Sequence, residues 1–513
     1  MRALAPDFAP YAWAASTAEV ARIAGVDPSQ VLRFDQNTPP LPLPSSRPGT
    51  IAGAVARISS YPGSTYPPLV DAIARYAGVE PENVVLGAGA DDLILLCARA
   101  WAGPGDEIAV PRSPTYPLYR IAAQLAEAQV TDCYSPAPAL TFACRPNNPT
   151  GSLDELPDAR PLVVDEAYFE FAGETALPLL GSGDVVLLRT FSKSFALAGA
   201  RVGYALASAD VAAELNARQS PAPISSLAAE LALAALRDPP DVGPVVAERE
   251  RLASALRALG FEPLPSHTNF VYVPVDDGHA LGDALLRHGL VVRAYDSAIR
   301  ASVRDTEDDD LLVETLARIL DRPSPAAASG GRRSRLLRAT AETRLAVRLS
   351  LDGAGRVRVA TGAGLYDHLL EQLAFHAGLD LVLEGAGDLE TGDHHTAEDA
   401  ALAFGGALDA ALGDRRGIAR YGDAVVPMDD ALARAAVDLG GRPHAELALE
   451  QDPGLATHML ASIAQSARAA IHVEATGRDP HHIAEAAFKA VGRALRTAVR
   501  RESAELPSTK GVL

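Results

Sequence analysis

An internal repeat in the last third of the chain places the strongest constraint on its fold. Residues 366–408 align with residues 457–495, and each segment reads as a helix, a strand, the pattern HHxxE and a second helix. In a helix, the glutamate of this pattern lies four residues after the first histidine and three after the second, so the three side chains can face one way. The sequence therefore predicts two similar half-domains in this part of the chain.

The repeat also concentrates candidate metal ligands. Nine of the twelve histidines follow residue 335, whereas no cysteine does. Histidine and carboxylate ligands without thiolate suit Mn, Fe or Zn in hydrolytic or Lewis-acid chemistry. One HHxxE pattern alone is better explained as a helix start with exposed histidines, but two copies in register favour a site. Because adjacent histidines point apart, each pair is expected to serve two different metal centres.

Residues 335–513 resemble imidazoleglycerol-phosphate dehydratases. The motifs that carry the resemblance are RATAET (338–343), DHLLEQLAFH, GDHHTAED, LGDRRGIARYG, VPMDDALARAAVDLGGRP, DPHHIAEAAFKA and the C-terminal PSTKGVL. The resemblance implies an α+β domain made of two duplicated half-domains, which binds a divalent metal as two Mn²⁺ ions per site. The metal ligands that it implies are His368, His394, His395, Glu398, His472, His481, His482 and Glu485, the two glutamates being catalytic candidates as well.

The same resemblance implies residues that bind the substrate. The candidates for the substrate phosphate are Arg420, Arg442, Lys489, Ser508 and Lys510. Glu342 and Gln372 are candidates for proton transfer and substrate contact. Among the other histidines, His376 is a lesser candidate, His458 is interpreted as a relic of the duplication, and His444 as a surface residue.

The first two thirds of the chain are organised around another stretch, RTFSKSFALAGARVGY (189–204). Lys193 lies there between two phenylalanines and precedes a run of Ala and Gly residues that an exposed loop does not require. Small residues allow a bulky ring to approach the backbone. Ser192 and Arg201 can hold an anionic group while Lys193 forms an imine.

Residues 108–204 alternate short apolar segments with helical ones, which predicts a parallel sheet covered by helices. Polar residues follow these strands, where open α/β sheets bind their ligands. The residues at successive strand ends are Tyr116, Asn148, Asp165, Tyr168 and Lys193. Singly, three of them have ordinary interpretations as a turn former, a helix cap and a packed aromatic, but their order favours one site.

The stretch around Lys193 resembles the Schiff-base segment of fold-type I pyridoxal-phosphate enzymes, and pyridoxal phosphate needs residues of these types. A buried carboxylate such as Asp165 keeps the pyridine nitrogen protonated, Asn148 and Tyr168 can donate to the phenolate oxygen, and Tyr116 can stack on the ring. A strand, a glycine turn and a helix start within VVLGAGADDLILLCARAW would aim backbone amides at the phosphate. These amides belong to Gly89, Ala90 and Asp91. The GAG sequence alone predicts only a turn.

Residues 10–322 resemble histidinol-phosphate aminotransferases through PTY, NNPTG, VVDEAYFEF and TFSKSFALAGARVGY. The resemblance implies an α/β domain of fold type I, with Lys193 binding the cofactor covalently and Ser192 and Arg201 on its phosphate. Tyr61 would reach the cofactor phosphate of a neighbouring subunit. Arg300 would bind the substrate carboxylate, and Arg293 the substrate phosphate. The chain departs from the family at Thr38, where NENP has Glu, at Arg304, where Gly is usual, and in the short loop between Arg293 and Arg300.

The two resemblances fall on consecutive steps of histidine biosynthesis. They imply metal-dependent dehydration of imidazole glycerol phosphate to imidazole acetol phosphate, and transamination of that product by glutamate to L-histidinol phosphate and 2-oxoglutarate. The expected units are residues 1–322, a linker at 323–334 that is rich in Pro, Ala, Ser, Gly and Arg, and residues 335–513. Two alternatives stay open: a different small pyridoxal enzyme in the first unit, such as a threonine-phosphate decarboxylase or an aromatic aminotransferase, or a scaffold without activity.

Composition excludes some other classes of function. The net charge of −19 is spread along the chain without a basic stripe, which argues against nucleic-acid binding. We find no run of about 18 apolar residues, so a membrane span is not expected. Cys97, Cys133 and Cys144 show no CxxC spacing, as in proteins of a reducing cytoplasm. We expect a cytoplasmic enzyme that acts on small phosphorylated imidazoles and, since both families form multi-subunit assemblies, a large homo-oligomer.

Overall fold

The structure is a computed structural model that divides into two compact units, Met1–Ala328 and Ser329–Leu513. It describes residues 8–11, 14–26, 28–38, 66–132, 137–182, 184–325, 332–353, 355–452, 454–503 and 505–507. Of the residues predicted above, Tyr61, Cys133, Ser508 and Lys510 lie outside these ranges. The unit boundaries predicted from the sequence, at residues 322 and 335, stay predictions.

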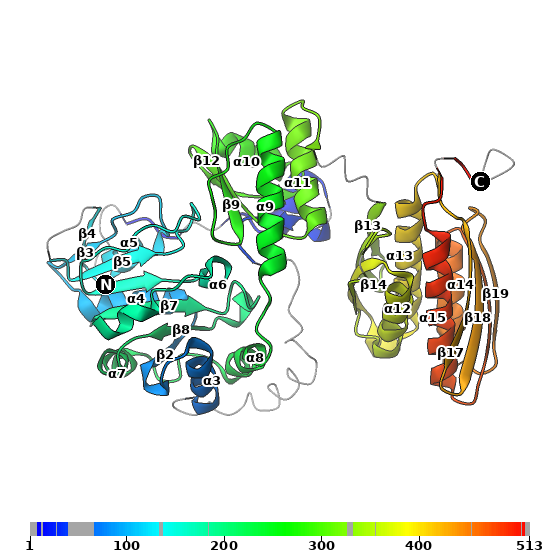
Figure 1. Ribbon diagram of the computed structural model, residues 1–513, viewed down its shortest axis with the longest axis horizontal. Helices are drawn as coiled ribbons and strands as arrows, with labels where there is room; N and C mark the ends of the chain where they lie inside the picture. The colour runs from blue at the N-terminus through cyan, green and yellow to red at the C-terminus, as the bar shows by residue number, and fades with distance from the viewer. Residues whose placement is uncertain are drawn as a thin grey trace. The chain divides into compact units, whose positions relative to one another are not determined.

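A seven-stranded sheet forms the centre of the first unit, with the strand order β2-β8-β7-β6-β5-β3-β4 (Figure 1). Its strands are β2 (Val84–Gly87), β3 (Glu107–Ala109), β4 (Gln129–Thr131), β5 (Leu140–Cys144), β6 (Leu162–Asp165), β7 (Val185–Thr190) and β8 (Gly203–Leu206). Only β8 runs antiparallel to its neighbours; the other adjacent strands are parallel. The parallel sheet predicted for residues 108–204 is present.

Helices cover both faces of this sheet. The helices are α3 (Pro67–Ala77), α4 (Ala90–Trp101), α5 (Leu118–Leu125), α6 (Phe169–Ala172), α7 (Ala209–Arg218) and α8 (Ser226–Leu236). Alternate residues of one strand enter different cores: Val163 packs with residues of α4 and α5, whereas Leu162 and Val164 pack with residues of α3 and α8. Strands buried on both faces therefore read as continuous apolar runs.

A smaller part of the first unit carries a three-stranded antiparallel sheet of order β11-β12-β9. Its elements are α9 (Gly243–Ala258), β9 (Phe270–Pro274), α10 (Gly278–Leu286), β10 (Leu290–Val291), β11 (Arg293–Tyr295), β12 (Ala298–Ser302) and α11 (Thr306–Ile319). Near the N-terminus lie α1 (Thr17–Ala24) and β1 (Leu32–Arg33), and β1 pairs in parallel with β10. Because β1 pairs with β10, residues 34–38, which follow β1, lie near the strand ends of the larger sheet where the polar residues are found.

The second unit is built from two halves of identical topology, as the repeat predicts. The first half contains β13 (Arg333–Ala339), β14 (Thr343–Ser350), β15 (Val357–Ala360), α12 (Gly364–Ala377), β16 (Asp380–Gly387) and α13 (His394–Leu412). The second contains β17 (Tyr421–Met428), β18 (Ala431–Asp438), β19 (His444–Leu449), α14 (Ala456–Ser466), β20 (Ala470–Thr476) and α15 (Pro480–Ala498). Corresponding strands take the same order in each sheet, β13-β14-β16-β15 and β17-β18-β20-β19.

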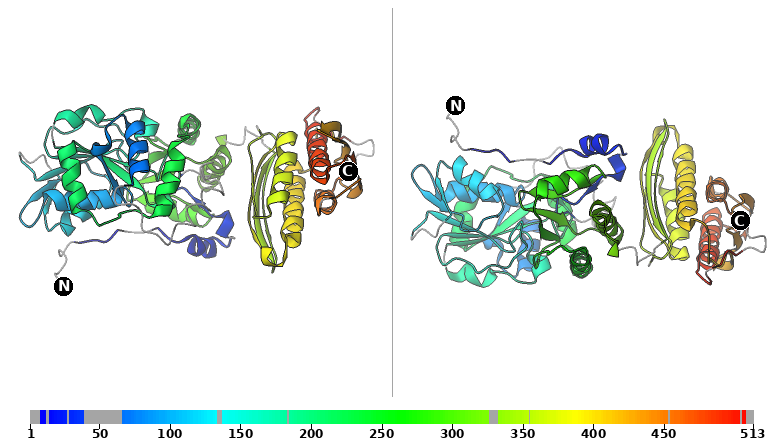
Figure 2. Two further views of the ribbon diagram at one scale, coloured as in Figure 1. Left: turned by 90° about the horizontal axis from the view of Figure 1, so that it is seen from below. Right: turned by 90° about the horizontal axis from the view of Figure 1, so that it is seen from above.

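The two sheets of this unit enclose its four helices, which share one apolar core (Figure 2). Glycines allow the closest approaches. A Cβ on Gly492 of α15 would come within 2.4 Å of the Leu373 carbonyl oxygen on α12, and one on Gly405 of α13 within 2.1 Å of Ser466 Oγ on α14. Among the helices that the structure describes, none combines the length and apolarity needed to cross a membrane.

Candidate functional site

The first candidate site surrounds Lys193, which follows β7. Its Nζ donates a hydrogen bond to the Gln36 carbonyl oxygen at 3.3 Å and lies 5.7 Å from the centroid of the Tyr168 ring. Burial, together with the positive charges of Arg300 and Arg201, lowers the pKa of the Lys193 amine to about 8. The amine is therefore deprotonated more readily than an ordinary lysine and is better prepared to act as a nucleophile.

Asp165 ends β6 as a buried carboxylate. It accepts hydrogen bonds from the Tyr119 hydroxyl at 2.7 Å and from the Ala167 amide at 3.0 Å. Burial raises the pKa of Asp165 to about 6, against the effect of these donors. Tyr119 was missed in the sequence analysis, because nothing in the apolar helix α5 distinguishes it from a core aromatic.

The turn before α4 brings three of the predicted residues together. Asp91 accepts a hydrogen bond from the Tyr116 hydroxyl at 3.0 Å and pairs with Arg201 at 2.9 Å. Gly89 has φ +86°, and a Cβ there would come within 2.7 Å of an Arg201 nitrogen. A glycine is thus needed for the arginine to approach the helix N-terminus, as a phosphate cradle requires. Ala90 begins α4, and Ser192 is buried beside Thr190, with 3.0 Å between their hydroxyl oxygens.

A second group of side chains faces the same region from the smaller sheet. Arg300 on β12 donates to Asn148 Oδ1 at 2.5 Å and to the Asp35 carbonyl oxygen at 2.6 Å, while its Nε is buried without a hydrogen-bond partner among the described residues. Arg293 is its direct partner across the β11–β12 pair, so both side chains project from one face. An orphaned guanidinium N–H beside a second arginine suits a ligand with more than one anionic group.

The segment after β1 contributes a residue that the sequence analysis missed. Asn37 donates to the Tyr168 hydroxyl at 2.9 Å and is itself bonded to Ser302. The sequence did offer one sign that Asn37 belongs to the site: it directly precedes Thr38, in the segment that corresponds to the NENP motif of the family. At the other departure, Arg304 pairs with the buried Asp308 at 2.7 Å, which gives this arginine a structural partner.

Two histidine and carboxylate clusters of the second unit correspond through the repeat, and a third group joins Glu342, Asp388 and His395. In cluster A, Glu485 of α15 lies 3.6 Å from His368 Nε2 and 3.4 Å from His481 Nε2. In cluster B, Glu398 of α13 lies 3.6 Å from His394 Nε2 and 3.4 Å from His458 Nε2. The candidate ligand atoms within each cluster all lie within 4.8 Å of one another.

Each cluster combines residues of both halves. Cluster A takes His481 and Glu485 from the second half and His368 from the first, whereas cluster B takes His394 and Glu398 from the first half and His458 from the second. His458, interpreted above as a relic, occupies the place in cluster B that His368 occupies in cluster A. His472 joins neither cluster in the described part of the chain; it is exposed on β20, with its ring 5.3 Å from that of His444. This geometry favours His458 over His472 as a ligand.

The second histidine of each pair points elsewhere. His395 Nδ1 lies 3.0 Å from Asp388, and Glu342 lies 3.6 Å from the same atom. His482 Nδ1 lies 2.7 Å from Asp430, which also accepts the Arg478 and Asp479 amides. These carboxylates raise the pKa of both imidazoles through hydrogen bonds. A carboxylate on Nδ1 leaves Nε2 of each ring as the atom available to a metal.

The candidate phosphate ligands are dispersed. Lys489 pairs with Glu485 at 2.7 Å, whereas Arg420 pairs with Asp438 at 2.7 Å and donates to the Pro507 carbonyl oxygen at 3.0 Å. Arg442 is exposed beyond the end of β18, and Gln372 lies one turn after His368 on α12. The partners of Lys489 and Arg420 thus lie on different elements, α15 for Lys489 and β18 for Arg420.

The clusters fit a divalent ion. Their donors are imidazole nitrogens and carboxylate oxygens, the set that Mn²⁺, Fe²⁺ and Zn²⁺ accept. His458 Nε2 is a buried atom without a hydrogen-bond partner among the described residues, as expected of a nitrogen reserved for a ligand. In the first unit, the Gly89 cradle, Asp165 and Lys193 fit the phosphate, the ring nitrogen and the aldehyde of pyridoxal phosphate.

Comparison with known proteins assigns a similarity to each unit. The family model for aminotransferase class I and II matches residues 29–316, and the model for imidazoleglycerol-phosphate dehydratase matches residues 361–495. An imidazoleglycerol-phosphate dehydratase of Methanothermobacter thermautotrophicus is 51% identical over 190 residues, which are 36% of this chain and 98% of that protein.

Solved structures resemble the first unit. Histidinol-phosphate aminotransferase from Sinorhizobium meliloti, in complex with pyridoxal-5'-phosphate, has a TM-score of 0.53 and 25% identity, covering 62% of this chain and 98% of that one. L-threonine-O-3-phosphate decarboxylase from Porphyromonas gingivalis has a TM-score of 0.51 and 21% identity, covering 57% and 100%. The second likeness shows the fold alone.

Proposed function

We propose that this chain, which belongs to the class I and II aminotransferases through its first unit and to the imidazoleglycerol-phosphate dehydratases through its second, catalyses two consecutive reactions. The second unit dehydrates imidazole glycerol phosphate to imidazole acetol phosphate. The first unit transaminates that ketone with glutamate to L-histidinol phosphate. The observation that carries this proposal is the pair of clusters in which each half supplies a histidine to the other.

In the dehydration, a proton must leave an unactivated carbon while a hydroxyl leaves its neighbour. Metal bound at these clusters would supply Lewis-acid stabilisation of charge on the imidazole of the substrate. His368, His481 and Glu485 would hold one ion, and His394, Glu398 and His458 another. Glu342, an exposed residue whose carboxylate lies 3.6 Å from His395 Nδ1, would accept or return a proton in this region.

In the transamination, pyridoxal phosphate when bound supplies the electron sink. Lys193 would supply the nucleophilic amine that holds this group and a base that moves a proton at Nζ. Asp165 would keep the ring nitrogen protonated, and Gly89, Asp91 and Arg201 would hold the phosphate. Arg300 would bind the substrate carboxylate and Arg293 the phosphate of histidinol phosphate, which distinguishes this reaction from one on an apolar or aromatic substrate.

The dispersed phosphate ligands favour an assembly of several subunits. Lys489 pairs with Glu485 of cluster A, whereas Arg420 donates a hydrogen bond to the Pro507 carbonyl oxygen, so these two candidate ligands are held at different places in the described part of the chain. His395 and His482 likewise contact carboxylates outside clusters A and B through Nδ1, which leaves Nε2 for a metal. We propose a homo-oligomer in which neighbours complete these sites, and light scattering that finds a fully active monomer would contradict it.

The test of both activities is mass spectrometry of the products formed from imidazole glycerol phosphate and glutamate. We expect histidinol phosphate from the wild-type protein loaded with metal and cofactor. Lys193→Ala should accumulate imidazole acetol phosphate, and Glu398→Gln should leave the first substrate untouched while retaining transamination of added ketone. An amine formed with loss of carbon dioxide would instead identify the first unit as a decarboxylase.

A further inference from the structure

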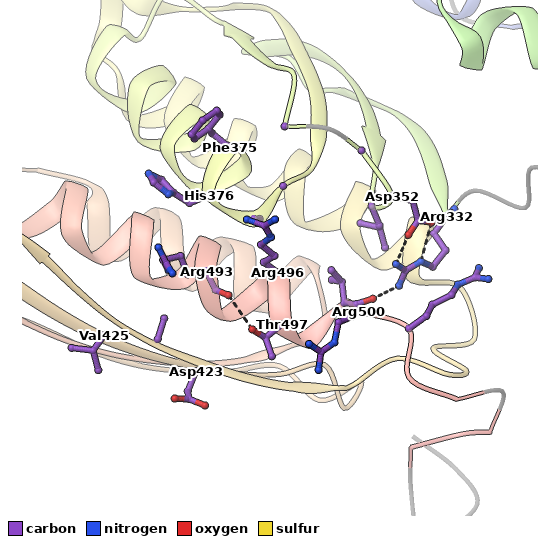
Figure 3. Close-up of a pocket in the computed structure, with 18 residues that line it drawn as sticks. Arg332, Asp352, Phe375, His376, Asp423, Val425, Arg493, Arg496, Thr497 and Arg500 are labelled. Carbon is purple, nitrogen blue, oxygen red and sulfur yellow. Dashed lines mark hydrogen bonds and ion pairs between the residues drawn. The ribbon is translucent and has the colours of Figure 1, made fainter.

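A cavity separate from both clusters lies within the second unit. Its volume is about 870 Å³, and its walls come from the end of α12, the end of α15 and the start of β17. Figure 3 shows Arg493 and Arg496 on α15, with Phe375 and His376 of α12 on one side and Asp423 and Val425 on the other. A cavity of this size can hold a small organic molecule.

The charges around the cavity do not balance. Five arginines and two aspartates line it. Arg332 is paired with Asp352 at 2.6 Å and donates to the Val499 carbonyl oxygen, and Arg500 is paired with Glu502. Arg493 and Arg496 form no hydrogen bond or ion pair through their guanidinium groups with any residue that the structure describes. Two adjacent positive charges are therefore left facing the cavity.

A purely structural role accounts for only part of this arrangement. The C-terminal end of α12 favours one nearby positive charge, and Arg496 lies there: a Cβ on Gly378 would come within 3.6 Å of its Nε. A second positive charge three residues away on the same helix face costs free energy through repulsion. Burial and the positive charges of Lys489 and Arg493 lower the pKa of His376, so its neutral imidazole brings no negative charge to offset the two arginines. A bound anion would offset their charges.

We propose that this cavity binds a small organic phosphate at a site distinct from that of the dehydratase substrate. Two guanidinium groups present planar forks that match the oxygens of a phosphate. The exposed rings and methyl groups of Phe375 and Val425 provide an apolar wall for the organic part, and the Asp423 carboxylate can accept hydrogen bonds from its hydroxyl groups. Arg493 lies four residues beyond Lys489, about 6 Å along α15, so the cavity is near the candidate substrate site without sharing its residues.

Isothermal titration calorimetry with glycerol 3-phosphate tests the proposal. The protein is full length and loaded with Mn²⁺ and pyridoxal phosphate, and inorganic phosphate is titrated in parallel. We expect the double variant Arg493→Gln/Arg496→Gln to lose one class of binding sites or to bind glycerol 3-phosphate about tenfold more weakly or worse. The variant Arg493→Lys/Arg496→Lys keeps the positive charges but not the planar guanidinium groups. Its affinity for glycerol 3-phosphate should lie between those of the wild type and the Gln variant. Tighter binding of the organic than of the inorganic phosphate would reflect the apolar wall, and equal affinities would contradict that part of the proposal.

The control removes the same charge elsewhere. Arg344→Gln/Arg468→Gln alters two exposed arginines of the same unit, neither of which lines the cavity, and should bind glycerol 3-phosphate as the wild type does. The KM for imidazole glycerol phosphate should be unchanged in the cavity variant. A KM that rises with the loss of binding would make the cavity part of the substrate site, and unchanged calorimetry would overturn the anion site. The calorimetric result stands even if the dehydratase activity proposed above is absent.

Discussion

At the scale of single residues, Lys193 is the side chain whose surroundings have the most direct chemical consequence. Its amine has a pKa of about 8, because burial and the charge of Arg300 disfavour the ammonium form. The neutral amine is the form that attacks an aldehyde. We expect the protein stripped of cofactor to capture pyridoxal phosphate faster as the pH rises through 8, measured by the growth of visible absorbance between pH 6.5 and 9.5.

Arg300→Gln provides the matched control for this profile. Removing the positive charge that most strongly lowers the lysine pKa should move the midpoint to higher pH, while Lys193→Ala should show no capture at all. A wild-type midpoint near 10.5, the ordinary lysine value, would show that the packing around Lys193 does not perturb it.

Asp430 is the residue whose contact with a histidine is most readily tested. Its 2.7 Å contact with His482 Nδ1 fixes which ring nitrogen carries the proton. We expect Asp430→Asn to weaken Mn²⁺ binding about 10- to 100-fold, measured by competition with a chromophoric chelator. Asp414→Asn, which alters an exposed aspartate paired with Arg416, should bind as the wild type does. Equal affinities for all three proteins would show that Asp430 does not position the imidazole.

These residues also show how far the sequence could predict the site. Lys193, Asp165 and the HHxxE triplets occur in local patterns whose spacing reflects one helix or one strand end. Asn37, Tyr119 and Asp430 do not, because each meets its partner only after distant segments pack together: Asn37 and Tyr168 are 131 residues apart, and Asp430 and His482 are 52 apart. The role of His458 could have been predicted, because the alignment of the two repeats makes His458 the counterpart of His368.

At the scale of elements, packing in the second unit depends on close approaches that side chains would prevent. Gly492 lets α15 contact α12, and no position for a Cβ exists without moving the Leu373 carbonyl group. We expect Gly492→Ala to lower the free energy of unfolding by about 1–3 kcal/mol, measured by urea denaturation. The shift between helices should also weaken metal binding at cluster A, whose residues lie on both.

Gly364→Ala is the control, because Gly364 begins α12 with no atom within 4 Å of its would-be Cβ. Alanine there should be neutral or slightly stabilising, since it favours the helix. Equal stability of the two variants would mean that the α12–α15 contact adjusts without cost.

The patterns of the elements were predictable to different degrees. Helix, strand, HHxxE and helix could be read in each repeat because periodicity is local. The order of the strands could not, because β16 and β20 enter between strands that precede them in the chain. The start of β13 at Arg333 also falls within the predicted linker, since Arg333 and Ser334 pair with Ser350 and Leu349 of β14.

At the scale of the whole molecule, the length of the predicted linker bears on whether the intermediate passes directly from one unit to the other. A random coil of the composition predicted for residues 323–334, about a dozen residues, would have a root-mean-square reach of roughly 20 Å, which would tether the two units without enclosing an intermediate. A small intermediate diffuses away much faster than a turnover of about 10 per second. We expect labelled imidazole glycerol phosphate, supplied with excess unlabelled imidazole acetol phosphate, to yield histidinol phosphate diluted in full. Undiluted label in the first product would instead show direct transfer.

The exchange of histidines between the halves of the second unit bears on its ancestry. A polypeptide equal to one half could have completed a cluster only by pairing with a second copy, and the pair would have held two identical clusters. We infer that joining the copies freed them to diverge: Lys489 pairs with Glu485, whereas Leu402 occupies the corresponding place after Glu398. A chain engineered with the second half repeated twice should therefore bind metal equally at both clusters, and failure to bind at either would argue against a paired ancestor.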